Sequence, residues 1–316
     1  MSRIRVCFLG TPSFAEVHLQ YLLSDSRYEV VGVVTQPDRP AGRNLQLTPS
    51  PVKILAVKGG IEVLTPENLK KEPEVFEKIK SWKADLAIVV AFGQILTQEF
   101  LDSFKYGAVN VHGSLLPLWR GAAPIQRSLE AGDAETGVAL QKMVKKLDAG
   151  PVIGARRMRL SDEIGSSELY AALSLLGCEL LKDDLLKYVS GEIKPVEQDE
   201  AKVTIAKKID KSESLLNWNL PAQLIHNRVR AFDMGPGTYV ILNEKRLKVH
   251  KTKIVHQTGD DVFMAGQIAR VAPDELIIQT GEHQISLLVV QPESKPRMSI
   301  LDFLKNVTYK KGDYFV

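Results

Sequence analysis

Asn110 and His112 are the residues of this chain whose types and spacing best suit chemistry. They alternate with valines in the apolar run Ala108-Val109-Asn110-Val111-His112, which stops at Gly113. The run predicts a short, buried, parallel-type strand, and side chains two residues apart on a strand point to the same side. An amide and an imidazole therefore emerge together near the end of the strand, where open α/β sheets bind ligands. The chemistry open to such a pair is hydrogen bonding to a bound group.

The alternative is a pair of hydrogen-bonded core residues. A strand interior has no structural need for two polar side chains, each of which costs a few kcal/mol when buried without a partner, so the pattern favours a ligand site. Asp148 is a second candidate, because it follows the apolar stretch 137–143 in the sequence Leu147-Asp148-Ala149-Gly150. Taken alone, an Asp before Ala-Gly is more typical of a turn than of a site.

Asn110-x-His112-Gly-Ser-Leu-Leu-Pro, followed by Leu147-Asp148-x-Gly150, resembles the paired signature of the 10-formyltetrahydrofolate-dependent formyltransferases. Along nearly the whole chain, the resemblance is to the branch that acts on methionyl-tRNA. Three further segments carry it, namely 10–15, 35–43 and 119–126. Glycinamide ribonucleotide formyltransferases lack a second domain and usually have Pro where Gly113 stands. Formyltransferases of nucleotide-linked aminosugars share the Gly but not the Pro-Asp-Arg-Pro-Ala-Gly-Arg loop.

The resemblance implies transfer of a formyl group from 10-formyltetrahydrofolate to the α-amino group of methionine on initiator methionyl-tRNA. Asn110 and His112 would donate hydrogen bonds to the oxygen that becomes negative in the tetrahedral intermediate. Asp148 would orient and charge His112, or help remove a proton from the amine, and the sequence leaves both roles open. A loop beside the pteridine ring of the folate would be formed by Ser114, Leu115, Leu116 and Pro117.

Basic residues in three places are candidates for binding tRNA phosphates. Arg246 and Lys248 fall on one face of a predicted strand, opposite Leu247 and Val249, although a solvated amphipathic strand explains that pattern equally well. The other candidates are the linker pair Lys207 and Lys208 and the loop residues Arg39 and Arg43. The resemblance implies that all three groups line one phosphate path.

Two segments depart from the family pattern. Asn44-Leu45-Gln46 stands where Gly-Lys-Lys is common, and Asp233-Met234-Gly235-Pro236-Gly237 replaces a frequent aromatic-Pro pair. The loop after Arg43 is therefore less basic than usual. An aminosugar-nucleotide formyltransferase, or an inactive RNA-binding relative, remains the alternative to a methionyl-tRNA enzyme.

Composition limits the class of protein. A chain of 316 residues is long enough for two domains, and 44% hydrophobic with 25% charged residues is ordinary for a soluble globular protein. The net charge of +3 permits a polyanionic partner without arguing for one. No run approaches the ~18 apolar residues of a membrane span, the first ten residues are too short for a signal peptide, and no cluster has metal-ligand spacing. We therefore expect a cytoplasmic monomer without a metal or a membrane contact.

The order of predicted elements indicates two domains. In the first half, apolar runs alternate with helical patterns, which predicts a doubly wound, mostly parallel α/β sheet of the Rossmann type. The predicted strands are residues 6–9, 29–34, 61–64, 86–91, 108–111 and 138–143. The polar, lysine-rich stretch 191–208 is typical of a linker. Short strands at close spacing follow, which predicts a small barrel that the resemblance makes OB-like. The expected boundaries are residues 1–190 for the catalytic domain, 191–208 for the linker and 209–316 for the tRNA-binding domain.

Overall fold

The computed structural model describes residues 3–41, 46–242, 244–257 and 262–315. The chain forms two compact units, each assembled from three separate stretches. Unit 1 comprises Met1–Gly121, Glu135–Met158 and Tyr170–Ala206, and unit 2 comprises Ala122–Ala134, Arg159–Leu169 and Lys207–Val316. In the described part of the chain, no helix is both long and apolar enough to cross a lipid bilayer.

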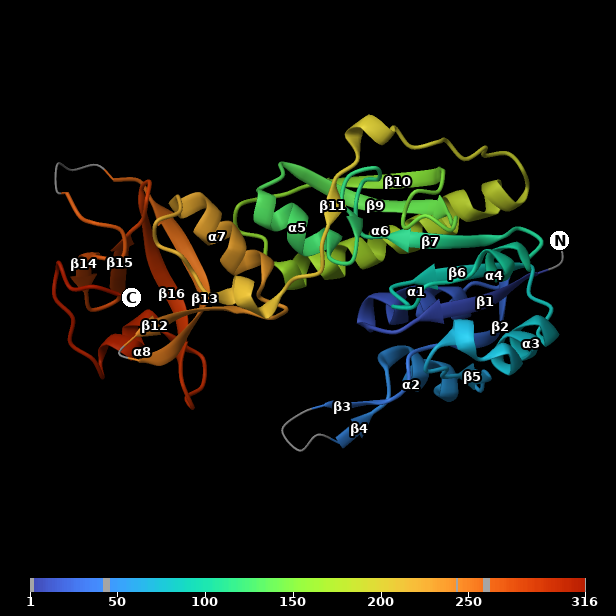
Figure 1. Ribbon diagram of the computed structural model, residues 1–316, viewed down its shortest axis with the longest axis horizontal. Coiled ribbons are helices and arrows are strands. Elements are labelled where there is room, and N and C mark those ends of the chain that lie inside the picture. The colour runs from blue at the N-terminus through green and yellow to red at the C-terminus, as the bar shows by residue number, and fades with distance from the viewer. Residues whose placement is uncertain (1–2, 42–45, 243, 258–261, 316) are drawn as a thin grey trace. The chain divides into compact units, whose positions relative to one another are not determined.

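A seven-stranded sheet forms the centre of unit 1, in the order β10-β9-β7-β6-β1-β2-β5 (Figure 1). Its strands are β1 (Ile4–Gly10), β2 (Tyr28–Val34), β5 (Val63–Leu64), β6 (Leu86–Val90), β7 (Ala108–His112), β9 (Glu135–Lys142) and β10 (Val152–Arg159). The pairs from β7 through β6, β1 and β2 to β5 are parallel, whereas β9 runs antiparallel to β7. Parallel strands covered on both faces are continuous apolar runs, as β6 is. The predicted mostly parallel α/β sheet is confirmed.

The sequence pattern misses one strand of this sheet, β10. It lies at the edge, and its side chains are mostly half-buried or exposed, including Arg156, Arg157 and Arg159. An edge strand needs only one apolar face, so its sequence lacks the continuous apolar run that marks the inner strands.

Helices flank the sheet of unit 1. They are α1 (Ser13–Ser24), α2 (Pro51–Lys58), α3 (Pro73–Ser81), α4 (Gln98–Asp102) and the part of α6 (Ser166–Val189) from Tyr170 onward, with a 3₁₀ turn η1 at Leu69–Lys71. α1 packs against β1, β2 and β6 with Phe14, Leu19 and Leu22 buried. A short hairpin of β3 (Arg39–Ala41) and β4 (Gln46–Thr48) projects from this unit (Figure 1).

The stretch 191–208 lies along unit 1 as far as Ala206. Val196 forms an isolated bridge with Val152, and a 3₁₀ turn η2 follows at Glu200–Lys202. β11 (Ile205–Ala206) then pairs in parallel with β8 (Arg120–Gly121), just beyond β7. Most of this stretch is therefore folded against the loop that follows β7.

Unit 2 contains an antiparallel sheet in the order β12-β13-β16-β15-β14, with β17 paired to β16. The strands are β12 (Thr238–Leu242), β13 (Lys245–Val255), β14 (Ile268–Ala272), β15 (Glu275–Gln279), β16 (Gln284–Pro292) and β17 (Met298–Ser299). The helices are α5 (Pro124–Ala131), α7 (Ala222–Ala231) and α8 (Ile300–Leu304), with a 3₁₀ turn η3 at Lys211–Ser214. α7 packs on α5 and β13 and contributes Ile225 and Val229 to the core. The predicted β-rich second domain is confirmed, and its closure into an OB-like barrel stays a prediction.

Candidate active site

Asn110 and His112 lie on β7, an inner strand of the sheet. β7 is paired with β6 on one side and with β9 on the other, and the two side chains are only 8% and 6% exposed. Among the residues that the structure describes, no hydrogen-bond partner is found for the Asn110 side-chain amide, and its atoms are not among the fully buried unpaired ones, so the amide keeps access to solvent. An amide left in this state can donate to a bound group.

The His112 ring makes two directed contacts. Its Nε2 donates to the backbone carbonyl of Trp119 at 2.9 Å. A carbonyl oxygen only accepts, so Nε2 carries a proton. Nδ1 faces Oδ1 of Asp148 at 3.8 Å, which is the distance of an ion pair and longer than a hydrogen bond. The ring is therefore oriented with one nitrogen toward the loop after β7 and the other toward the carboxylate.

Asp148 lies in a turn, with φ of +48°, and its side chain points inward. The backbone N–H of Gly121 donates to Oδ2 at 2.9 Å, and Nε2 of Gln141 donates to Oδ1 at 3.1 Å. The sequence predicts a turn here, and the structure adds a largely buried carboxylate. The three predicted catalytic residues thus come together in unit 1.

Two polar residues around this group were not predicted from the sequence. Gln141 is 1% exposed and lies opposite Asn110 in the β7–β9 pairing. It interrupts the apolar strand β9 in the way that Asn110 interrupts β7, so the same signal could have identified it. Gln198 lies in the polar stretch 191–208, where a further polar residue carries no signal.

The predicted folate loop follows β7 directly. Ser114 is fully buried, and its hydroxyl donates to the carbonyl of Leu118 at 2.6 Å. Leu115 is buried against Gly137 of β9, where a side chain on the glycine would collide with it. Leu116 and Pro117 are half-buried. Ser114 and Leu115 therefore shape the loop, while Leu116 and Pro117 keep part of their apolar surface exposed.

The predicted phosphate-binding residues of unit 1 are only partly described. Arg39 is exposed on β3 and pairs with Glu67 at 3.2 Å. Arg43 lies outside the described residues.

In unit 2, the predicted phosphate-binding residues are exposed. Lys207 and Lys208 point outward, and their backbone carbonyls accept hydrogen bonds from Arg127. Arg246 and Lys248 lie on the exposed face of β13, and the guanidinium of Arg246 sits 4.7 Å from the ring centre of Tyr239. The predicted alternation along β13 is present, because Leu247 and Val249 are buried.

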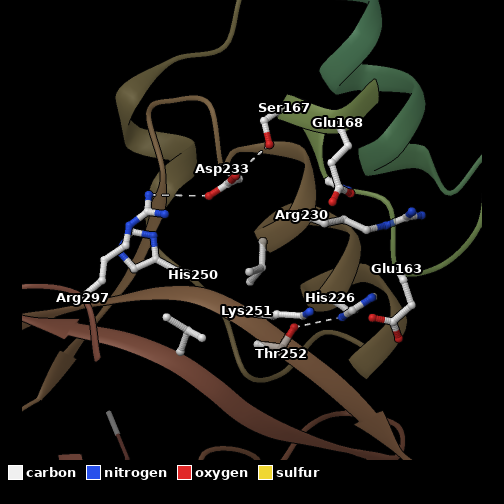
Figure 2. Close-up of a pocket in the computed structure, with 13 residues that line it drawn as sticks. Glu163, Ser167, Glu168, His226, Arg230, Asp233, His250, Lys251, Thr252 and Arg297 are labelled. Carbon is white, nitrogen blue, oxygen red and sulfur yellow. Dashed lines mark hydrogen bonds and ion pairs between the residues drawn. The ribbon is translucent and has the colours of Figure 1, made fainter. Parts of the chain in front are cut away.

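Unit 2 also has a cavity of about 250 Å³ whose charged lining is largely paired (Figure 2). Asp233 accepts a hydrogen bond from Ser167 at 3.3 Å and pairs with Arg297 at 3.6 Å. His226 bonds to the hydroxyl of Thr252 at 2.9 Å. Asp233 and His226 are thus held by internal contacts within the lining.

Nothing in the described ranges gathers three or more His, Cys, Asp or Glu side chains in a way that could hold a metal ion. Cys7 is buried in β1, and burial raises the pKa of its thiol. Cys178 is partly buried, and burial together with Glu179 raises its pKa to about 11. Both thiols are thus held in the protonated, unreactive form at neutral pH.

Comparison with known proteins identifies the family. Residues 2–184 match the family model described as formyl transferase, and residues 208–308 match formyl transferase, C-terminal domain. The chain is 55% identical over 314 residues to a methionyl-tRNA formyltransferase of Bdellovibrio bacteriovorus, covering 99% of both chains. It is 43% identical over 303 residues to that of Pediococcus pentosaceus, covering 96% of this chain and 94% of the other.

Among solved structures, an N-formyltransferase of Helicobacter canadensis in complex with folinic acid and dTDP-3-aminofucose is similar in fold. It has a TM-score of 0.67 and 19% identity, and covers 92% of this chain and 99% of the other. At this identity the likeness concerns the fold alone. With two family models matched in succession and whole-length relatives up to 55% identical, the chain belongs to the methionyl-tRNA formyltransferase family.

Proposed function

We propose that this protein transfers a formyl group from 10-formyltetrahydrofolate to the α-amino group of methionine on initiator methionyl-tRNA. Relatives that share its whole length and carry the name methionyl-tRNA formyltransferase support this reaction. The aminosugar-nucleotide alternative has only a likeness of fold, at 19% identity, in its favour. The product would be N-formylmethionyl-tRNA for translation initiation.

The observation that carries the proposed chemistry is the unpartnered, nearly buried amide of Asn110 beside His112. A free α-amine has a pKa of about 7.7–8, so a useful fraction is neutral at physiological pH and can attack the formyl carbon. The new C–N bond forms, and the formyl oxygen gains negative charge in the tetrahedral intermediate. The amide N–H of Asn110 would donate to this oxygen, and one positioned donor is worth roughly 10²–10³ in rate.

His112 would act as the second donor to the same oxygen. Its Nε2–H donates to the carbonyl of Trp119, so the oxyanion would compete for this proton or share it. Asp148 would hold the ring in orientation through the contact at Nδ1. As the intermediate collapses, the bond to N10 of the folate breaks, N10 takes a proton, and the amine loses one. Asp148 is the carboxylate of the proposed site and would help remove the proton from the amine.

The folate would lie beside the loop of Ser114, Leu115, Leu116 and Pro117. The half-buried apolar surface of Leu116 and Pro117 suits a flat aromatic ring, while the adjacent polar trio suits its formyl group. Small-molecule sites commonly combine apolar walls with a few polar groups in this way.

We further propose that Arg39, Arg43, Lys207, Lys208, Arg246 and Lys248 bind tRNA phosphates. The exposure of the described members supports this role. We also propose that residues 1–190 form the catalytic domain, that 191–208 are the linker and that 209–316 bind tRNA. We expect the protein to act as a cytoplasmic monomer that needs no metal.

The experiment that tests the proposal is formyl transfer from 10-formyltetrahydrofolate to initiator tRNA charged with methionine. A parallel reaction offers a dTDP-linked aminosugar as the acceptor. We expect transfer to the charged tRNA only. Transfer to the aminosugar, or to neither acceptor, would overturn the proposed function in favour of one of the two alternatives.

A further inference from the structure

Gln198 is hydrogen-bonded to the turn that carries Asp148. Its side-chain Nε2 donates to the backbone carbonyl of Asp148 at 2.8 Å and to that of Gly150 at 2.6 Å. Asp148 has a positive φ, a conformation that costs a non-glycine residue about 1–2 kcal/mol and persists only where the surroundings hold it. The two hydrogen bonds of one amide group therefore help to hold this turn in a shape that directs the carboxylate inward.

Arg120 fixes the orientation of that amide group. Its Nε donates to Oε1 of Gln198 at 3.0 Å, and a guanidinium has donors only, so the oxygen of Gln198 must face it. Arg120 is 3% exposed, and its Nη2 donates to Glu200 at 2.8 Å. With the oxygen held by a buried arginine, the NH₂ group has to point at the turn. An amide that could rotate would not keep its NH₂ group directed at the turn.

The chain that follows Gln198 also supports the side chain of Asp148. Ile205 and Ala206 pair with Arg120 and Gly121, and the N–H of Gly121 donates to the Asp148 carboxylate. Residues from 198 to 206 thus hold both the backbone of the turn and the donor to its side chain. The contacts made by residues 198–206 join positions that are 48 to 85 residues apart, so they form only in the folded protein.

We propose that Gln198 is a positioning residue for Asp148 in the formyl-transfer reaction, an inference that rests on the proposed function. Its side-chain hydrogen bonds go to Arg120, to the backbone of Asp148 and Gly150 and, at 3.5 Å, to Gln141, so we place its action in keeping the carboxylate in position. The Asp148–His112 separation of 3.8 Å is close to the upper limit of an ion pair, so a shift of the carboxylate away from the ring would break the contact. Misplacement of a catalytic group by about 1 Å can cost 10²-fold in rate.

The test compares three variants with the wild type. Gln198→Ala removes the amide, and Gln198→Glu keeps an oxygen for Arg120 while setting a carboxylate oxygen against two carbonyls. Glu197→Gln, a change of the exposed neighbouring residue, is the matched control. We expect kcat to fall roughly 10- to 100-fold in both Gln198 variants, with KM for each substrate within about threefold. The control should keep the wild-type kcat, and circular dichroism should show all three folded.

A double-mutant cycle distinguishes positioning from a general effect on the fold. If Gln198 acts through Asp148, then Gln198→Ala should cause little further loss of kcat in an Asp148→Asn background. Full additivity of the two losses, or an unchanged kcat in Gln198→Ala alone, would overturn the inference.

A readout that needs no turnover separates this inference from the proposed function. With ¹⁵N-histidine labelling and a His112→Gln variant for assignment, the ring signals of His112 should move in Gln198→Ala in the direction seen for Asp148→Asn. If wild-type protein failed to formylate methionyl-tRNA, the proposed function would fall, and the histidine signals would still decide whether Gln198 positions Asp148. Unmoved His112 signals in Gln198→Ala would refute the positioning role.

Discussion

Nε2 of His112 donates a hydrogen bond to the backbone carbonyl of Trp119, 2.9 Å away and seven residues further along the chain. This bond fixes which ring nitrogen carries the proton and turns the other nitrogen toward Asp148. The Nε2–H group of the imidazole is therefore already hydrogen-bonded within the protein. Asn110, whose amide has no partner within the described ranges, is by contrast an immediately available donor.

Asn110→Ala should therefore lower kcat by roughly two to three orders of magnitude, because it removes a donor to the oxyanion. KM for 10-formyltetrahydrofolate should change far less, since this contact strengthens mainly in the transition state. Steady-state kinetics of the purified variant measure both quantities. Asn68→Ala, at an exposed asparagine of the same unit, is the control. A wild-type kcat in Asn110→Ala would remove this residue from the mechanism.

Gly121→Ala should impair turnover, although Gly121 is not one of the three proposed catalytic residues Asn110, His112 and Asp148. An added Cβ would lie 2.5 Å from the carbonyl oxygen of Ala206, and the φ of +129° is unfavourable for alanine. The backbone would have to shift, and its hydrogen bond to Asp148 would be distorted. We expect kcat to fall at least tenfold, and by about 100-fold if the carboxylate moves by about 1 Å.

Gly191→Ala is the matched control for this prediction. Gly191 also has a positive φ, of +80°, but an added Cβ would meet nothing within 4 Å. This variant should lose about 1–2 kcal/mol of stability from backbone strain and keep its kcat. Equal kcat losses in the two glycine variants would mean that the contact with Ala206 has no special role.

His18 should make the stability of the protein sensitive to mild acid. It is fully buried on α1, its Nδ1 donates to the carbonyl of Phe14 at 2.7 Å, and its Nε2 has no partner. Burial lowers its pKa to about 4 from the ordinary 6.5. The unfolded chain therefore binds a proton at a higher pH than the folded chain, so stability is full above pH 6.5 and is lost as the pH falls from there toward 4.

The free energy of unfolding lost through His18 should reach roughly 2 kcal/mol at pH 5, because one pKa unit corresponds to about 1.4 kcal/mol. Unfolding in denaturant at pH 7.5 and pH 5.0 measures it. His18→Gln keeps a neutral donor for the Phe14 carbonyl, and the difference from the wild type cancels other titrating groups. The same decrease in both proteins would show that His18 does not cause it.

Lys248→Ala should weaken the binding of charged tRNA without affecting the folate. Lys248 is exposed on β13 beside Arg246. Each lysine that contacts a phosphate contributes about one unit to the slope of log affinity against log salt, so the variant should raise KM for tRNA and reduce that slope by about one. Lys305→Ala removes the same charge from an exposed site that pairs with Asp302 at 2.8 Å, and should leave the slope unchanged. Equal slopes for Lys248→Ala and the wild type would exclude a phosphate contact at this position.

The sequence by itself determined the parts of this protein that depend on local patterns. Continuous apolar runs identified the inner strands β1, β6 and β7, because burial on both faces demands apolar side chains at every position. Asn110 and His112 were recognisable because polar residues inside such a run need a reason to be there. The family signature then added Asp148, which local pattern alone would have left as a turn residue.

The tertiary structure decided how these residues are held. Three contacts join parts of the chain that no local pattern links. Gln198 donates to the backbone of the Asp148 turn, Gly121 donates to the Asp148 carboxylate, and Gln141 pairs opposite Asn110. The edge strand β10 was missed for a related reason, since solvent on one side removes the need for apolar residues. Local periodicity reports which side chains are buried, whereas the partner of a buried polar group is set by the packing of distant segments, and only the folded chain specifies it.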